Sequence, residues 1–535
     1  MSQHHKPSRS LAGIAGIVAV ATLISKVFGL VRQQVIAAAF GIGAVADAYN
    51  YAYVIPGFLL ILLGGINGPF HSAIVSVLAK QNDKAKSARL VETITTLIGG
   101  ILIVVSVIVF FNASFCIDIV APSLKSNVRE IAIEQLKIMS PIALLAGLIG
   151  IGFGTLNAAD MYWLPSISPL LSSITVIIGV GMLAIQLGTQ ITLPKYAILG
   201  GQILAWGTLA GALLQWLVQL IAQWKAGLGK LALRFDFKQE GVSDVLKVMG
   251  PATLSSGMLQ INLYTDLFFA STIAGAAAAM NYSNLLIQTP LGIISNVILV
   301  PLLPIFSRLA DPSSWSDLKI RIRQGLILSA VTMLPLSALM ITLSEPIVRV
   351  IYERYAFDQK ASTLVSSVLI ASSLGMFVYL GRDVLVRVFY ALGDGETPYK
   401  ISIVNIFINA LLDFIFVKPL GAPGLVLATV SVNFTSMIAL LWVLNRKLHG
   451  LPLKEWGRPL IGLIISSVMC GLTSYGTLLG LQNVLGSNGL LIQLLEILLS
   501  SAAGLGIFYI MATQLQLPEV DLFVDKMKQK FSRNR

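Results

Sequence analysis

Apolar runs of about 20 residues recur along this chain from end to end, with short segments rich in Lys and Arg between many of them. A helix of that length crosses the roughly 30 Å hydrocarbon core of a bilayer. With 56% hydrophobic and only 12% charged residues, the chain has too little polar sequence to cover so much apolar sequence in water. The sequence therefore predicts an all-α polytopic membrane protein rather than a soluble enzyme.

We expect about fourteen transmembrane helices in the chain, with both termini in the cytoplasm. Basic residues gather in alternate connecting segments, as the positive-inside rule requires, and an even number of helices puts the first cluster and the basic tail on the same side. The first apolar stretch is too long for a signal peptide and is expected to be retained. The expected helices lie near residues 11–39, 46–79, 90–112, 128–156, 164–187, 197–223, 243–271, 276–307, 322–343, 362–391, 399–417, 421–445, 457–480 and 489–514.

A weak internal repeat relates the two halves of the chain. Several short matches share offsets of 231 to 236 residues, which corresponds to six helices. The matches are Ala21-Thr22-Leu23 with Ala252-Thr253-Leu254, Tyr51 with Tyr282, Pro56 with Pro290, and Leu156…Pro165 with Leu392…Pro398. Parallel repeats of this kind place a substrate site between two lobes. We expect pseudo-symmetric six-helix lobes at 1–225 and 240–447, two further helices at 456–516, and a basic cytoplasmic tail at 517–535.

Charged side chains within the expected helices are candidates for function, because a charge at bilayer depth costs at least about 2.5–3.5 kcal/mol. Lys26 and Arg32 lie in the first helix and predict a cationic cluster that attracts an anionic headgroup. Arg382 and Asp383 are adjacent and are not expected to form a simple internal pair. Arg387 lies near the expected inner surface, where snorkelling explains its charge.

A second group of candidates carries oxygen ligands. Asn409 and Asp413 are one helical turn apart and share a face. Asp266 lies in the expected seventh helix and Thr429 in the twelfth. Such ligands suit Na⁺ or a proton relay. A polar clamp between helices explains Asn409 and Asp413 equally well.

Other classes of protein are disfavoured by what the sequence lacks. The net charge of +12 is distributed as in membrane proteins, so no nucleic acid partner is expected. Cys116 and Cys470 are expected to be packing residues. No clustered His/Cys pattern, DDxxD run or GxxxxGK[ST] loop occurs, which weighs against a nucleotide-driven pump or a membrane transferase. The chain is therefore not expected to be an enzyme or to need a cofactor.

Short motifs spread over the chain resemble those of the MurJ (MviN) lipid II flippases, a family of the multidrug and oligosaccharidyl-lipid exporter superfamily. The most specific is the stretch SKVFGLVR from Ser25 to Arg32. The others are Ala39-Phe40-Gly41, Asp47-Ala48, Ile55-Pro56, Asn67-Gly68-Pro69-Phe70, Phe389-Tyr390-Ala391 and Thr397-Pro398. The resemblance extends over essentially the whole chain.

The resemblance implies an alternating-access transporter that moves the undecaprenyl-pyrophosphate-linked peptidoglycan precursor outward across the cytoplasmic membrane. A cationic cavity would hold the pyrophosphate, and the helices at 456–516 would form a groove for the lipid tail. Arg32 matches a cavity arginine of the family, Ser25 matches a nearby polar position, and Lys26 stands where many members carry Arg. The expected partners are the lipid-linked glycan, membrane lipids and cell-wall synthases.

The resemblance also implies a sodium site. Asp266, Asn409, Asp413 and Thr429 fall at the corresponding positions, and Leu425 would supply a backbone carbonyl. Na⁺, or H⁺ in its place, is the expected coupling ion.

Several charges of the family pattern are absent from this sequence. An arginine pair is replaced by the apolar stretch Leu59 to Leu63, a further arginine by Leu285, and an acidic residue by Gln33. Asn67 replaces the Glu of the family's E-G-A-F motif and is retained as a substrate-binding candidate.

We hypothesise that Arg382 substitutes for the missing arginine of the second lobe, and Lys137 is a further source of positive charge. Another lipid-linked oligosaccharide as the cargo, or a non-transporting scaffold for wall synthesis, remains an alternative. A cationic drug is disfavoured as cargo by the expected positive cavity.

Overall fold

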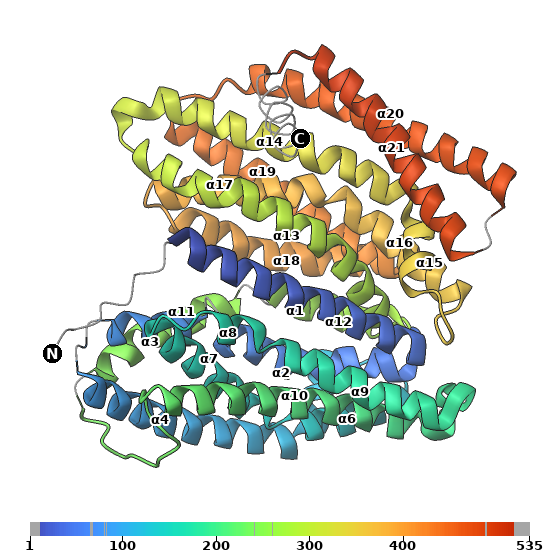
Figure 1. Ribbon diagram of the computed structural model, residues 1–535. Coiled ribbons are helices and arrows are strands. Elements are labelled where there is room, and N and C mark those ends of the chain that lie inside the picture. The colour runs from blue at the N-terminus through green and yellow to red at the C-terminus, as the bar shows by residue number, and fades with distance from the viewer. Residues whose placement is uncertain are drawn as a thin grey trace. The chain divides into compact units, whose positions relative to one another are not determined.

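The structure is a computed structural model that describes residues 11–64, 68–79, 81, 83–239, 241–258, 261–486 and 489–517. Within these ranges the regular secondary structure is helical, and no strand is present (Figure 1). Contacts divide the chain into two compact units. The first unit is Met1–Ala278 with Tyr355–Phe357, and the second is Ala279–Arg354 with Asp358–Arg535.

The first unit holds twelve α-helices and two 3-10 turns within the described residues. They are α1 (Leu11–Phe40), α2 (Ala44–Gly64), α3 (Pro69–Leu78), α4 (Lys84–Phe111), α5 (Ala113–Val120), α6 (Ser126–Met139), α7 (Ile142–Ala158), α8 (Trp163–Ile167), α9 (Leu170–Leu187), η1 (Gly188–Thr192), η2 (Pro194–Tyr196), α10 (Ala197–Lys225), α11 (Val242–Met258) and α12 (Ile261–Ala270).

The second unit begins at Ala279, the fourth residue of the next helix, and contains the remaining elements. They are α13 (Ala276–Arg308), η3 (Pro312–Ser314), α14 (Trp315–Thr342), α15 (Ser344–Tyr352), α16 (Gln359–Leu374), α17 (Met376–Ala391), α18 (Glu396–Leu420), α19 (Ala422–Lys447), α20 (Leu453–Leu485) and α21 (Leu490–Gln514).

The described residues contain 12 helices or helix pairs that are long and apolar enough to cross a membrane, or 13 if the bent pair α6–α7 counts as one span. That pair turns by 44° at its break. The expected count of fourteen is therefore not confirmed. The segment that makes the difference is 243–271, in which the described residues form α11 and α12 and residues 259–260 lie outside the description. With 10 residues α12 is too short to span a bilayer alone, and α11 carries Asp244 and Lys247.

The core of the first unit is built around α7, a helix of small and apolar residues that is almost entirely buried. It packs against α2, α3, α4 and α10. Gly150 makes the closest of these approaches, because a Cβ at that position would lie 1.9 Å from the Leu63 carbonyl oxygen of α2. Small residues permit such close contact between membrane helices, where the hydrophobic effect does not drive packing.

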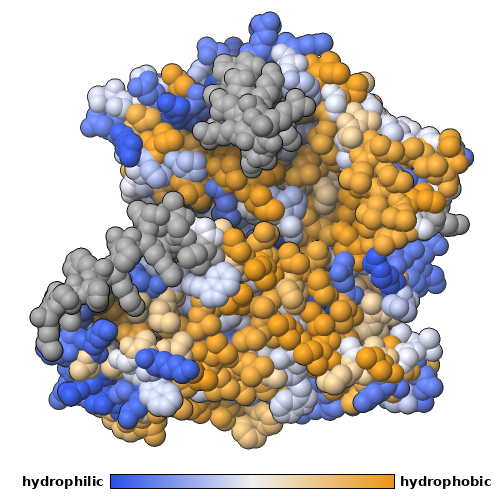
Figure 2. All heavy atoms as spheres, in the orientation of Figure 1, coloured by the Kyte–Doolittle hydropathy of each residue, from blue (hydrophilic) through white to orange (hydrophobic). Residues whose placement is uncertain are grey.

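The surface of the first unit has the banding expected of a membrane protein. In Figure 2, hydrophobic side chains cover the middle of its helices, and hydrophilic side chains gather toward the two ends. Large apolar side chains on α4 face outward, including Ile101, Val104 and Phe111. Lipid tails are as apolar as these side chains, so the exposure of these side chains to the bilayer carries no hydrophobic cost in free energy.

In the second unit, α14 lies against α16, α17 and α20, and α18 pairs with α19. The last two helices, α20 and α21, pack along each other and against α14. Their shared core includes Ala330 of α14, Leu463 and Cys470 of α20, and Phe508 of α21. Cys470 thus has the packing role expected for it, whereas Cys116 is only half-buried in α5.

The boundary between the two units falls later in the chain than the expected boundary between the lobes. Residues from 240 onward were expected to start the second lobe, yet α11 packs against α3 and α12 against α5, so both helices belong to the first unit. The division into lobes at 225 and 240, which was inferred from the repeat, stays a prediction.

Candidate functional site

The candidate substrate residues of α1 differ in their surroundings. The Lys26 side chain is exposed, while Ser25 and Arg32 are half-buried. Six residues of helix separate the two cations by about 9 Å along the axis and about 120° around it. They therefore present charge on neighbouring faces of α1 rather than at one point.

Arg32 is held close to α2. Its guanidinium interacts electrostatically with the Tyr53 hydroxyl. The Nε atom is shielded from solvent and has no hydrogen-bond partner among the described residues. A partly buried guanidinium with an unused donor is suited to an oxyanion, which accepts charge-assisted hydrogen bonds from Arg. Among the four substrate-binding candidates that the structure describes, Arg32 has the geometry closest to a ligand-binding group.

Arg382 is a connector within the second unit. Its Nε donates to the Ser436 hydroxyl of α19 at 3.1 Å, and its Nη2 donates to the Ser402 hydroxyl of α18 at 3.4 Å. Its Nη1 lies 3.7 Å from Asp383 Oδ1, so the two adjacent residues do form an ion pair, contrary to expectation. Side chains of neighbouring residues can meet because both are long enough to bend toward a common edge of the helix. These contacts do not test whether Arg382 substitutes for the missing arginine of the second lobe, and that hypothesis stays a prediction.

The other positions considered for substrate binding are Lys137, the apolar stretch Leu59 to Leu63, and Asn67. Lys137 pairs with Glu134 at 3.1 Å. Leu62 and Leu63, in the stretch where the family has arginines, belong to the apolar core of the first unit. Asn67 lies outside the described residues. The substrate assignment therefore stays a prediction that rests chiefly on α1.

Three of the candidate cation ligands meet on α18 and α19. Asn409 Nδ2 donates to Asp413 Oδ2 at 2.9 Å, and the Thr429 hydroxyl donates to Asn409 Oδ1 at 3.4 Å. Asn409 and Asp413 are 1% and 0% exposed, which places a carboxylate in an apolar helix pair without contact with water. Leu425 is buried one turn before Thr429 on α19, so its carbonyl lies on the same side of that helix.

Asp266 belongs to α12 in the first unit and is also buried. Whether it completes the set on α18 and α19 stays a prediction. The donor set itself fits a hard cation, since it offers carboxylate, amide, hydroxyl and backbone oxygens. The same contacts also constitute the polar clamp that the sequence left open as an alternative.

The roles of two further buried polar residues were not expected from the sequence. The buried residues of α18 are Pro398, Asn405, Asn409 and Asp413, so Asn405 extends the polar stripe by one turn. Its position four residues before Asn409 is the signal that could have revealed it. Large apolar residues of the same helix, such as Phe407 and Phe414, are exposed instead.

Asp47 is the second unexpected residue. Its carboxylate is 3% exposed and accepts hydrogen bonds from the Gly275 N–H at 3.0 Å and the Ala278 N–H at 3.2 Å. Gly275 directly precedes α13 and Ala278 lies in its first turn, where the helix dipole favours a negative charge. Asp47 therefore fixes the start of α13 to α2. No local pattern marks this role, because the contact spans 228 positions of the chain.

Comparisons with known proteins agree over nearly the whole chain. Residues 36–498 match the family model described as lipid II flippase MurJ. A probable lipid II flippase MurJ of Synechocystis sp. is 58% identical over 533 residues, which cover 100% of both chains. The lipid II flippase MurJ of Burkholderia cenocepacia is 29% identical over 479 residues, covering 87% of this chain and 89% of that protein.

Two solved structures share the fold. A lipid II flippase MurJ in an inward closed conformation matches with a TM-score of 0.75 and 22% identity, covering 94% of this chain and 99% of the other. An inward-facing multidrug resistance transporter of the MATE family matches with a TM-score of 0.60 and 16% identity, covering 81% and 98%. The expected all-α polytopic membrane fold is therefore confirmed, apart from its helix count and lobe layout.

Proposed function

Because this chain belongs to the lipid II flippase MurJ family, we propose that it moves lipid II from the inner to the outer leaflet of the bacterial cytoplasmic membrane. The observation that carries the proposal is the 58% identity to a probable lipid II flippase over the full length of both chains. The basic connecting segments support an orientation with both termini in the cytoplasm. Moving a lipid requires no bond to be made or broken, so no enzymatic step is assigned.

The residues proposed to hold the headgroup are Lys26 and Arg32, with Ser25 beside them. Arg32 offers a planar fork that suits a phosphate, and its Nε is shielded from water. Lys26 acts as a point charge on the neighbouring face of α1. A pyrophosphate carries several charged oxygens, so it can engage both cations although they are about 9 Å apart along the helix.

Transport would proceed by alternating access, coupled to a cation gradient or to the membrane potential. One charge that crosses 100 mV gains about 2.3 kcal/mol, which is enough to bias an equilibrium between two conformations. Asn409, Asp413 and Thr429, with the Leu425 carbonyl and Asp266, are the residues that would hold Na⁺. Their support is the buried carboxylate of Asp413 and its hydrogen-bonded chain through Asn409 to Thr429.

The test is the leaflet distribution of lipid II in bacteria that are depleted of their own flippase and express this chain. We expect the chain to restore outward-facing lipid II and a Lys26→Ala/Arg32→Ala variant to lose it at equal expression. The matched control is Arg321→Ala/Lys400→Ala, which removes two cations that each have a polar partner on their own helix, Gln324 and Glu396. This control should transport normally.

Other outcomes separate the alternatives. Failure of the wild-type chain to restore lipid II, despite membrane insertion, would favour another lipid-linked oligosaccharide as cargo. Restored growth that survives neutralisation of both Lys26 and Arg32 would favour a scaffold that binds cell-wall synthases. The first result would contradict lipid II as the cargo, and the second would contradict the proposed site.

A further inference from the structure

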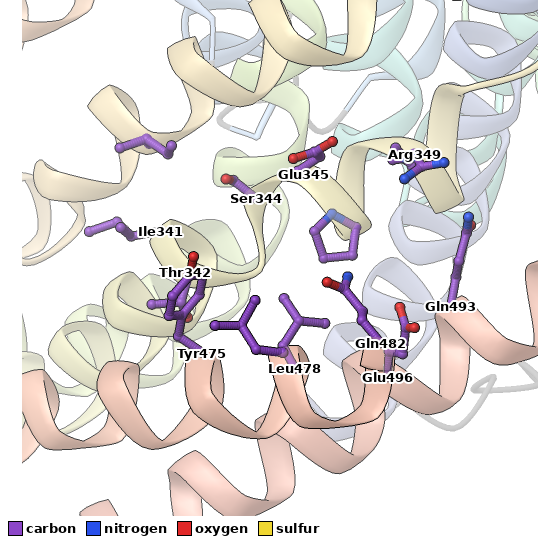
Figure 3. Close-up of a pocket in the computed structure, with 13 residues that line it drawn as sticks. Ile341, Thr342, Ser344, Glu345, Arg349, Tyr475, Leu478, Gln482, Gln493 and Glu496 are labelled. Carbon is purple, nitrogen blue, oxygen red and sulfur yellow. The ribbon is translucent and has the colours of Figure 1, made fainter. Parts of the chain in front are cut away.

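A polar cavity of about 500 Å³ lies within the second unit, between α14 and α15 on one side and α20 and α21 on the other (Figure 3). It is near the C-terminal end of α14 and the connection between α20 and α21. Its polar lining includes Ser344, Glu345, Arg349, Gln482 and Glu496, and its apolar side includes Leu478. A cavity of this size accommodates a small organic group rather than a bare ion.

Glu496 is the most unusual residue of the lining. It is 1% exposed, and its Oε1 has no hydrogen-bond partner among the described residues. Figure 3 shows its carboxylate directed into the cavity, toward Gln482. Burying a carboxylate without a donor costs several kcal/mol, so a donor is expected to reach it from within the cavity.

Arg349 supplies the positive charge of the lining. Its Nε lies 3.3 Å from Glu353 Oε2, one turn further along α15, so its ion pair is with that residue rather than with Glu496. The cavity therefore has an acceptor without a donor at Glu496 and a guanidinium on the opposite wall.

We propose that this cavity binds a zwitterionic group, with an ammonium at Glu496 and an anionic oxygen at Arg349. An ammonium supplies three donors for the carboxylate, and Gln482 can accept a further one. A purely anionic ligand is disfavoured, because Glu345 and Glu496 would repel it. The apolar side at Leu478 suits the first carbons of a lipid, so the headgroup of an aminophospholipid and a soluble zwitterion are the two sources of this chemistry.

The experiment is native mass spectrometry of the purified full-length protein with phosphatidylethanolamine and phosphatidylglycerol. The two lipids share a phosphate, but only the first has an ammonium. We expect the wild-type protein to retain phosphatidylethanolamine preferentially. Glu496→Gln should abolish that preference and weaken phosphatidylethanolamine binding about ten-fold or more, since a hydrogen bond to a charged group contributes about 1.5–3 kcal/mol. Arg349→Gln should weaken both lipids.

Glu130→Gln and Arg354→Gln are the controls, because both residues are exposed and lie outside the cavity lining.

Soluble phosphoethanolamine distinguishes the two sources of the zwitterion. If phosphoethanolamine raises the melting midpoint of the wild type but not of Glu496→Gln, the ligand is a soluble zwitterion. If only the lipid binds, the ligand is a lipid headgroup. Equal retention of the two lipids by the wild type, or an unchanged preference in Glu496→Gln, would overturn the proposal. The cavity would then hold water alone.

Discussion

Arg234 and Glu92 form an ion pair with a distance of 3.0 Å, although 142 positions separate them in the chain. Glu92 belongs to α4 and is buried, and its second carboxylate oxygen accepts the Lys230 N–H at 3.2 Å. One turn further along α4, the Thr96 hydroxyl bonds both the Ala232 carbonyl and the Arg234 N–H. The segment after α10 is thus fixed along α4 by side chains of that helix.

Replacing Glu92 with Ala should release this segment. The Lys230 N–H and the Arg234 guanidinium would lose their acceptor, which should lower the free energy of unfolding by about 1–3 kcal/mol. Trypsin, which cleaves after Lys and Arg, should cut at 230–234 faster than in the wild type. Glu130→Ala removes an exposed glutamate from α6 and serves as the control. An unchanged cleavage rate in Glu92→Ala would show that the ion pair does not hold the segment.

Two glycines of α21 should respond differently to substitution. A Cβ at Gly504 would lie 2.7 Å from the Cys470 carbonyl oxygen of α20, whereas nothing lies within 4 Å of a Cβ at Gly506. Gly504→Ala should therefore force the two helices apart and cost about 1–3 kcal/mol. Gly506→Ala should leave the melting midpoint unchanged or slightly raised, because Ala favours a helix. Equal midpoints for the two variants would mean that α20 and α21 are not closely packed at this point.

The stability of the connection between α17 and α18 should depend on pH through Asp394. Partial burial raises the pKa of Asp394, but the Lys447 ammonium, at 2.6 Å, and the Thr397 N–H and hydroxyl together hold it below its ordinary value. A lowered pKa means that the folded protein favours the carboxylate. The stabilisation is therefore complete above the unfolded pKa of about 3.9 and is lost as the pH falls through the folded pKa.

Thermal melting between pH 7 and pH 3 measures this contribution of Asp394. Asp394→Asn should have a lower midpoint than the wild type at pH 7, and the difference should shrink toward pH 3. A difference that stays constant over the whole range would exclude the carboxylate charge as its cause.

Asp413→Asn should remove the response of the protein to sodium. The substitution keeps the shape of the side chain but removes the charge that would bind the cation in a buried position. In the wild type, Na⁺ should raise the melting midpoint relative to an equal concentration of choline, as a ligand that binds only the folded state does. Asp383→Asn, which removes an exposed carboxylate of α17, should retain the response. A sodium response that persists in Asp413→Asn would favour the polar clamp.

Much of the fold could be predicted because membrane helices are long, apolar and bounded by charge. The expected segments at 90–112, 276–307 and 489–514 correspond closely to α4, α13 and α21. The segment at 128–156 was read as one helix, since hydropathy does not register the bend between Met139 and Ile142. The short helices α5 and α15 were not expected, because neither reaches the length of a membrane span.

The candidate sites were predictable only where residues are close in sequence. Asn409 and Asp413 are one turn apart, so their contact follows from helical geometry. The bonds of Arg382 to Ser436 and Ser402 depend on how three helices pack, which no local spacing encodes. The Glu496 carboxylate and the Arg349 guanidinium line one cavity from helices that are more than a hundred residues apart, and only the folded unit brings them together.

The buried polar stripe of α18 bears on how the translocation machinery inserts this part of the chain. Alone in lipid, a helix with a carboxylate such as Asp413 in its C-terminal half carries a cost of up to about 2.5–3.5 kcal/mol on insertion scales. Its polar partner Thr429 lies on α19, and a single glycine, Gly421, separates the two helices. The pair is therefore expected to enter the bilayer as a helical hairpin, so that α18 becomes committed to the membrane only once α19 has been synthesised.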